Sequence, residues 1–250
     1  MRVAYLVLAH HLPAQLARLV KHLKRSGDVY VHLDRKSNVG FFGLEGCHVL
    51  KDRIEVWWGG QSILEAELAL ARAALLGSYD YYCLLSGQCA PIKPLSAFEA
   101  FLVANAPAEH IHYVEMATHW PQGAVRFEKH YFERRTPVNR LLNRLLLTLP
   151  YRRVIPAGLT RYTGSQWWTL THDCLSHVVC VFASRPDIAS IFRNTRNTCE
   201  IGFQTVIGNS AFASRVNASP IHELEFRTGA SHPRVWTMDE LPRLLTSNAH

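Results

Sequence analysis

Apolar and amphipathic segments alternate at the start of the chain. Val3–Ala9 is a continuous apolar run, which is typical of a buried parallel strand. Pro13 then begins a stretch whose apolar residues share one helical face, namely Leu16, Leu19, Val20 and Leu23. A second mostly apolar run covers residues 29–33. This strand–helix–strand order predicts a Rossmann-like α/β fold with a mostly parallel central sheet flanked by helices.

The same alternation continues along the chain. We predict strands over 54–56, 81–85, 110–114 and 166–170, and helices over 62–75, 94–104, 139–147, 171–183 and 200–207. Residues 120–123 are turn-like, and 237–245 are amphipathic. Ser62 and Glu65 have the spacing of a capping box at a helix N-terminus. We expect one domain over 1–250, with a nucleotide-binding half (1–114) and an acceptor-binding and catalytic half (115–250).

The composition limits which kinds of ligand and which cellular location we expect. The 250 residues are 48% hydrophobic and carry a net charge of +7, which suits one globular domain with affinity for anionic ligands. No nucleic-acid-binding signature accompanies the charge, so we expect no nucleic-acid partner. The six cysteines form no CxxC pair, and no apolar run is long enough to cross a membrane. These features favour a reducing, cytoplasmic location.

Several catalytic motifs are absent from the sequence. It lacks GxGxxG, GxxxxGK[ST], GxSxG and HExxH, which removes support for dinucleotide oxidoreduction, P-loop chemistry, serine hydrolysis and zinc proteolysis. It also lacks the DxD motif with which many nucleotide-sugar transferases hold a divalent ion. His110 and His112 have no third ligand nearby, so we expect packing or surface roles for them rather than a metal site.

Seven segments, taken in order, resemble one known family. They are AYLVLAH at 4–10, VHLDRKS at 31–37, WGGQS at 58–62, YDYYCLLSGQ at 79–88, PIK at 91–93, GSQWW at 164–168 and EIGFQT at 200–205. The chain resembles the core-2/I-branching β-1,6-N-acetylglucosaminyltransferases, a family that also includes peptide O-xylosyltransferases, over roughly residues 3–240. The resemblance implies a GT-A type fold, a UDP-sugar donor with GlcNAc ahead of xylose, inversion at the anomeric carbon, and no metal cofactor.

Donor recognition is expected where the strands end. Asp34 follows the second strand, and the resemblance assigns this position to the uracil ring N–H. His10 ends the first matching segment, and Ser86 and Gly87 end another strand, so we place all three in the nucleotide site. A loop aspartate that caps the next turn, and an ordinary strand-to-loop glycine, are the structural alternatives.

Glu200 is the predicted general base. An inverting transfer needs one group to take the proton of the acceptor hydroxyl, and the resemblance places a glutamate here. Cys199 stands where the family often has an acidic residue, and Gly202 where it has a bulkier one. The alternative is a first-turn glutamate that interacts with the helix dipole.

The acceptor and the diphosphate need further side chains. The resemblance assigns Glu115 and Arg126 to the acceptor sugar, with surface charges as the alternative. Adjacent residues on a strand face opposite ways, so one of Trp167 and Trp168 could stack on a sugar while the other packs in the core. Arg227 and Arg234 are candidates to neutralise the leaving UDP. The family's later F-x-R-K-F segment is absent, so either another base such as Arg243 substitutes or activity is weakened, and a catalytically silent sugar-nucleotide-binding module is the competing function.

An arginine- and leucine-rich stretch suggests a further surface. Its arginines flank a leucine-rich segment over 141–147 and are Arg134, Arg135, Arg140, Arg144, Arg152 and Arg153. Such a basic amphipathic helix suits peripheral contact with an anionic membrane, and a solvated basic face is the alternative. We expect a glycan or glycolipid acceptor in bacterial surface polysaccharide synthesis, and the oligomeric state stays open.

Overall fold

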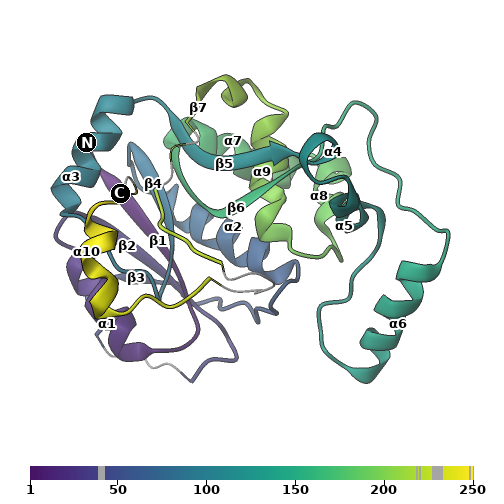
Figure 1. Cartoon of the computed structure of the whole chain (residues 1–250), viewed down its shortest axis with the longest axis horizontal. Coiled ribbons are helices and arrows are strands. Elements are labelled where there is room, and N and C mark those ends of the chain that lie inside the picture. The colour runs from purple at the N-terminus through teal and green to yellow at the C-terminus, as the bar shows by residue number, and fades with distance from the viewer. Residues whose placement is uncertain (39–42, 218, 220, 227–232, 248, 250) are drawn as a thin grey trace.

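A computed structural model describes residues 1–38, 43–217, 219, 221–226, 233–247 and 249. Within these residues one seven-stranded sheet has the order β3-β2-β1-β4-β6-β5-β7, with helices on both faces (Figure 1). The strands are β1 (Val3–Ala9), β2 (Gly27–Leu33), β3 (His48–Val49), β4 (Tyr81–Ser86), β5 (Glu109–Glu115), β6 (Tyr162–Thr171) and β7 (Val216–Asn217). Only β6 runs antiparallel to its neighbours. The predicted α/β class with a mostly parallel sheet is confirmed.

The helices connect the strands and cover the sheet. The α-helices are α1 (Pro13–Leu23), α2 (Ser62–Ala74), α3 (Leu95–Asn105), α4 (Met116–His119), α5 (Val125–Glu128), α6 (Pro137–Thr148), α7 (His172–Ser184), α8 (Pro186–Phe192), α9 (Gly202–Gly208) and α10 (Leu241–Leu245). The 3₁₀ turns are η1 (Pro121–Ala124), η2 (Thr198–Glu200), η3 (Ala211–Arg215) and η4 (Met238–Glu240). No single described helix is long and apolar enough to cross a membrane; α7 and α8 pass that test only as a pair bent by 93°.

Alternation along β1 divides the core between the two faces of the sheet. Tyr5 and Val7 pack with the apolar faces of α1 and α3. Ala4 and Leu6 pack on the other face with residues of α2, α7 and α9. Because successive side chains of a strand point to opposite faces, a central strand covered on both sides must be apolar throughout. That is the pattern of Val3–Ala9 in the sequence.

Two local predictions are wrong. Residues 54–56 are extended but belong to no strand, and β3 is the neighbour of β2 instead. Ser62 does not form a capping box with Glu65. Its Oγ accepts from the backbone N–H of Trp57 (2.8 Å) and donates to the Glu133 carboxylate (2.9 Å), which also accepts from the Ser62 N–H (3.0 Å). A distant carboxylate therefore satisfies the N-terminus of α2.

Candidate active site

Three predicted donor-site residues meet at one edge of the sheet. Strand β1 lies between β2 and β4, and its register pairs Ala9 with Leu33 and Leu8 with Ser86. His10, Asp34 and Gly87 each follow directly after these strands. Their backbones therefore lie together at the carboxyl edge, where open α/β sheets bind ligands.

Asp34 is held by its local surroundings. It is only 8% exposed, and its Oδ1 accepts from the backbone N–H groups of Lys36 (2.9 Å) and Val56 (3.3 Å). The Lys36 ammonium lies 3.2 Å from Oδ2 and 4.7 Å from the centre of the Trp57 ring. Asp34 thus caps a turn, as the structural alternative supposed, and a uracil contact stays a prediction. Sequence reasoning missed Lys36 and Trp57 at this edge.

The residues at the ends of β1 and β4 differ in what they offer a ligand. Burial, together with the neighbouring His11, lowers the pKa of His10, so its imidazole is neutral at neutral pH. A Cβ on Gly87 would lie 2.9 Å from the Cβ of Ala9, so packing inside the protein already requires this glycine. The Ser86 hydroxyl accepts from the Gln88 N–H at 3.1 Å. Nucleotide contacts of Ser86 and Gly87 stay predictions.

Glu200 sits at the centre of a charged cluster. It ends η2, just before α9, so the predicted helix 200–207 begins two residues late. Its Oε2 accepts from Arg126 Nη1 at 2.6 Å and from Asn197 Nδ2 at 3.4 Å. Its side chain is 38% exposed, so solvent still reaches the carboxylate. The structure brings together two predicted site residues that are 74 positions apart.

Arg126 is positioned by α5 and by an aromatic ring. Its guanidinium carbon lies 4.4 Å from the centre of the Trp120 ring, and its side chain is only 15% exposed. Stacking on one face and a short ion pair at the tip restrict the guanidinium to one place. The side chain therefore orients the Glu200 carboxylate, a role additional to the acceptor contact that the sequence predicted.

The loop over residues 56–60 contacts both Asp34 and the turn that carries Glu200. The Asn197 N–H donates to the carbonyl of Gly59 (2.8 Å), and the Thr198 hydroxyl donates to that of Gly60 (2.8 Å). At the other end of the loop, Val56 contacts Asp34. The three residues between Val56 and Gly60 span at most about 10 Å. The turn that carries Glu200 therefore lies close to the carboxyl ends of the strands.

Gly60 of this loop packs closely against Glu133. A Cβ on Gly60 would overlap the Glu133 carboxylate, its nearest atom being 1.9 Å away. Burial raises the pKa of Glu133, and the hydrogen bonds from Ser62 oppose this rise. Sequence reasoning missed Glu133, because nothing local marks a carboxylate that caps a helix 71 residues earlier.

A buried polar layer lies under Glu200. Glu67 on α2 is fully buried, and its Oε1 accepts from Gln166 Nε2 at 2.8 Å. Burial raises the pKa of Glu67 well above its usual range, and the hydrogen bond from Gln166 opposes this rise. Gln204 Nε2 donates to the carbonyls of Ser165 (2.6 Å) and Cys199 (3.2 Å). These bonds fix β6 and the turn that carries Glu200.

The two tryptophans of β6 have different environments. Trp168 is fully buried and stacks on Phe203, with ring centroids 4.8 Å apart. It therefore cannot contact an acceptor, and its prediction as an acceptor residue is wrong. Trp167 is half-buried and stacks on His222, with ring centroids 5.6 Å apart, and its acceptor contact stays a prediction. Glu115 is exposed at the end of β5, and its acceptor contact also stays a prediction.

The structure describes one of the two predicted diphosphate arginines. Arg227 lies outside the described residues. The Arg234 guanidinium pairs with Glu225 (3.3 Å) and Glu240 and lies over the Trp236 ring, and Arg243 pairs with Glu225 as well (2.9 Å). Arg234 thus already pairs with two carboxylates, while its Nε has no hydrogen-bond partner among the described residues, and its contact with the donor diphosphate stays a prediction. In the described ranges no three His, Cys, Asp or Glu side chains gather as a metal site.

Comparison with known proteins identifies the family. The family model of the Core-2/I-Branching enzymes matches residues 3–241. The chain belongs to this glycosyltransferase family. Xylosyltransferase 2 of Pan troglodytes is 27% identical over 84% of the chain, and that of Mus musculus is 27% identical over 86%.

The match is partial in length. The chain spans about a quarter of these relatives, 25% and 26% respectively. Among solved structures, a 4-diphosphocytidyl-2C-methyl-D-erythritol synthase aligns with a TM-score of 0.38 and 10% identity, over 76% of this chain and 84% of its own. The family membership therefore comes from the sequence match.

Proposed function

We propose that this GT-A type chain transfers a sugar from a UDP-sugar to a glycan hydroxyl, with inversion, without a metal ion, and with Glu200 as general base. One observation carries the proposal. Glu200 is the only one of the predicted site carboxylates, among described residues, that is both open to solvent and fixed by an arginine from another element. A base needs both properties, since it must meet a bound hydroxyl in one orientation.

The proposed reaction uses the two carboxylate oxygens differently. Oε2 is occupied by Arg126 and Asn197, which leaves Oε1 to accept the proton of the acceptor hydroxyl. The hydroxyl oxygen forms the new bond to the anomeric carbon from the face opposite UDP. The anomeric C–O bond breaks as UDP leaves with the electron pair. The negative charge on UDP requires cationic neutralisation. We assign this role to Lys36 at the strand edge or to Arg234, each of which already pairs with a carboxylate.

GlcNAc is our first choice of donor sugar and xylose our second. The xylosyltransferase relatives favour xylose, while the wider resemblance favours GlcNAc. A screen of UDP-sugars that measures UDP release, with and without EDTA, tests donor and mechanism together. We expect release from one of these two donors, unchanged by EDTA. Turnover that EDTA abolishes would contradict the metal-free mechanism.

The ion pairs of Arg234 favour one competing function. If the leaving diphosphate has no cation to neutralise it, the chain is a silent UDP-sugar-binding module. Calorimetry that detects UDP binding, combined with no UDP release from any donor, would support this alternative. Release from one donor would exclude it.

A further inference from the structure

Helix α6 projects from the rest of the protein. It lies at the edge of the molecule and is joined to the body by two extended segments (Figure 1). None of its twelve residues is buried. Its inner side is fixed mainly by Asn143, which accepts from the Phe132 N–H (2.8 Å) and donates to the Phe132 carbonyl (2.9 Å). Since a helix of this length is marginal in water alone, packing on some partner would stabilise it.

The outer side of α6 is an apolar stripe. Its residues have the spacing i, i+3, i+4, i+7, and they are Val138 (66% exposed), Leu141 (57%), Leu142 (39%) and Leu145 (48%). This spacing places them on one face of the helix. Soluble helices normally turn such a face inward, but here the inner side is formed by Asn143 and Leu146. The stripe therefore faces solvent.

Positive charge surrounds the stripe. Between Glu133 and Asp173 the sequence contains seven arginines and no acidic residue. Arg140 and Arg144 lie one turn apart beside the stripe, are exposed, and form no ion pair within the part of the chain that the structure describes. An apolar stripe bordered by unpaired arginines complements one partner, a bilayer with anionic headgroups.

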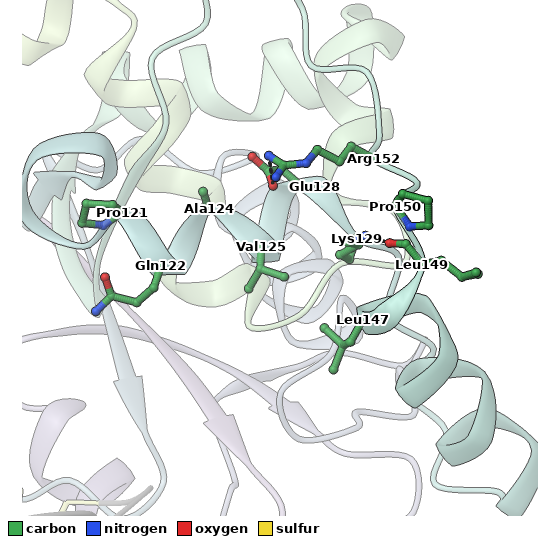
Figure 2. A pocket seen from close by; sticks show the side chains of 10 residues that line it. All are labelled: Pro121, Gln122, Ala124, Val125, Glu128, Lys129, Leu147, Leu149, Pro150 and Arg152. Atoms are coloured by element: carbon green, nitrogen blue, oxygen red, sulfur yellow. Dashed lines mark hydrogen bonds and ion pairs between the residues drawn. The ribbon is translucent and has the colours of Figure 1, made fainter.

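The base of this projection leads to the active site. The Arg153 N–H donates to the Glu128 carbonyl at 2.8 Å, which ties the return segment to α5. A cavity of about 570 Å³ lies between α5 and the end of α6, with Val125 and Leu147 in its wall (Figure 2). The residue after Val125 is Arg126, which pairs with Glu200. A surface that holds α6 would thus lie near the proposed base.

We propose that α6 binds the surface of an anionic bilayer, with the stripe at the boundary of headgroups and acyl chains and with Arg140 and Arg144 on lipid phosphates. This contact goes beyond the proposed transfer and is independent of it, because binding can be measured without turnover. It does suit an acceptor that is attached to a lipid.

Vesicle flotation of the full chain tests the proposal. We expect the chain to float with vesicles of phosphatidylcholine containing about one third phosphatidylglycerol, and to bind pure phosphatidylcholine far less. Arg140→Gln/Arg144→Gln should weaken binding roughly 30-fold, because each basic side chain near an anionic surface contributes about a fivefold factor. Leu141→Glu/Leu145→Glu should abolish it. All four side chains are exposed, so the variants should keep the wild-type melting temperature.

The matched controls change exposed residues outside α6 and its flanking segments. Arg18→Gln/Lys21→Gln removes the same charge from exposed positions of α1, and Leu76→Glu/Val103→Glu changes two exposed apolar residues, 91% and 62% exposed. Both should float like the wild type. Wild-type chain that stays unbound, or controls that lose binding equally, would overturn the proposal. Loss of self-association in Leu141→Glu/Leu145→Glu, seen by sedimentation without any vesicle binding, would instead assign the stripe to a second copy.

Discussion

Replacing Arg126 tests how the proposed base is oriented. Arg126→Ala removes the 2.6 Å bond to Glu200 and the stacking on Trp120. A hydrogen bond to a charged group contributes about 1.5–3 kcal/mol. Because Glu200 is 38% exposed, water replaces part of that bond, and we take the lower end of the range. At about 1.4 kcal/mol per factor of ten, kcat should fall roughly 10- to 30-fold.

The assay is steady-state UDP release with the best donor. We expect the decrease in kcat while the KM for the UDP-sugar stays within about twofold, because Arg126 contacts the base and no predicted donor residue. Arg126→Lys keeps the charge but offers a single point donor, so it should recover part of the loss. Arg185→Ala removes an exposed ion pair with Asp187 elsewhere and should leave kcat unchanged. An unchanged or increased kcat in Arg126→Ala would refute the orienting role.

Three further outcomes follow from the layer around the site. Gly60→Ala should cost about 1–3 kcal/mol in thermal unfolding, because its Cβ displaces Glu133 from Ser62; the cost should shrink in a Glu133→Gly background, which also removes the Cβ of residue 133, and equal costs in both would argue against this contact. Burial raises the pKa of Glu67, so above about pH 4.3 the unfolded chain loses this proton first and the free energy of unfolding falls by up to about 1.4 kcal/mol per pH unit. Glu67→Gln should remove that slope, and parallel pH curves for the two proteins would contradict it. Trp168→Ala should cost about 3–5 kcal/mol and Trp167→Ala clearly less, by denaturant unfolding; equal losses would contradict the difference in their burial.

The spacing of apolar residues correctly predicted the strands and helices whose burial imposes that spacing. The apolar run at Val3–Ala9 and the helix with Leu16 and Leu23 inward are found as expected, because burial on two faces or on one imposes the periodicity. The cap of α2 was mispredicted because the Ser62 hydroxyl donates to Glu133, which is distant in the sequence, and not to a group of its own helix. Local spacing cannot reveal such a competitor.

The site was only partly predictable for the same reason. The resemblance supplied Asp34, Arg126 and Glu200, but the contact between the last two depends on how α5 and η2 pack. Arg234 was a candidate because the resembled family uses an arginine near its C-terminus, but the pairing of this residue with Glu225 and Glu240 depends on tertiary packing. The sequence could not tell which of Trp167 and Trp168 is fully buried, because that depends on how Phe203 and His222 pack against β6.

The most direct test of the central claim compares turnover and binding in Glu200→Gln. The amide keeps the size of the side chain and can still hydrogen-bond, but it cannot accept the acceptor proton. We predict that UDP release in the presence of acceptor falls at least about 100-fold, while calorimetry gives a Kd for UDP within about threefold of the wild type. Turnover that survives in Glu200→Gln, in protein that binds UDP normally, would show that Glu200 is not the base.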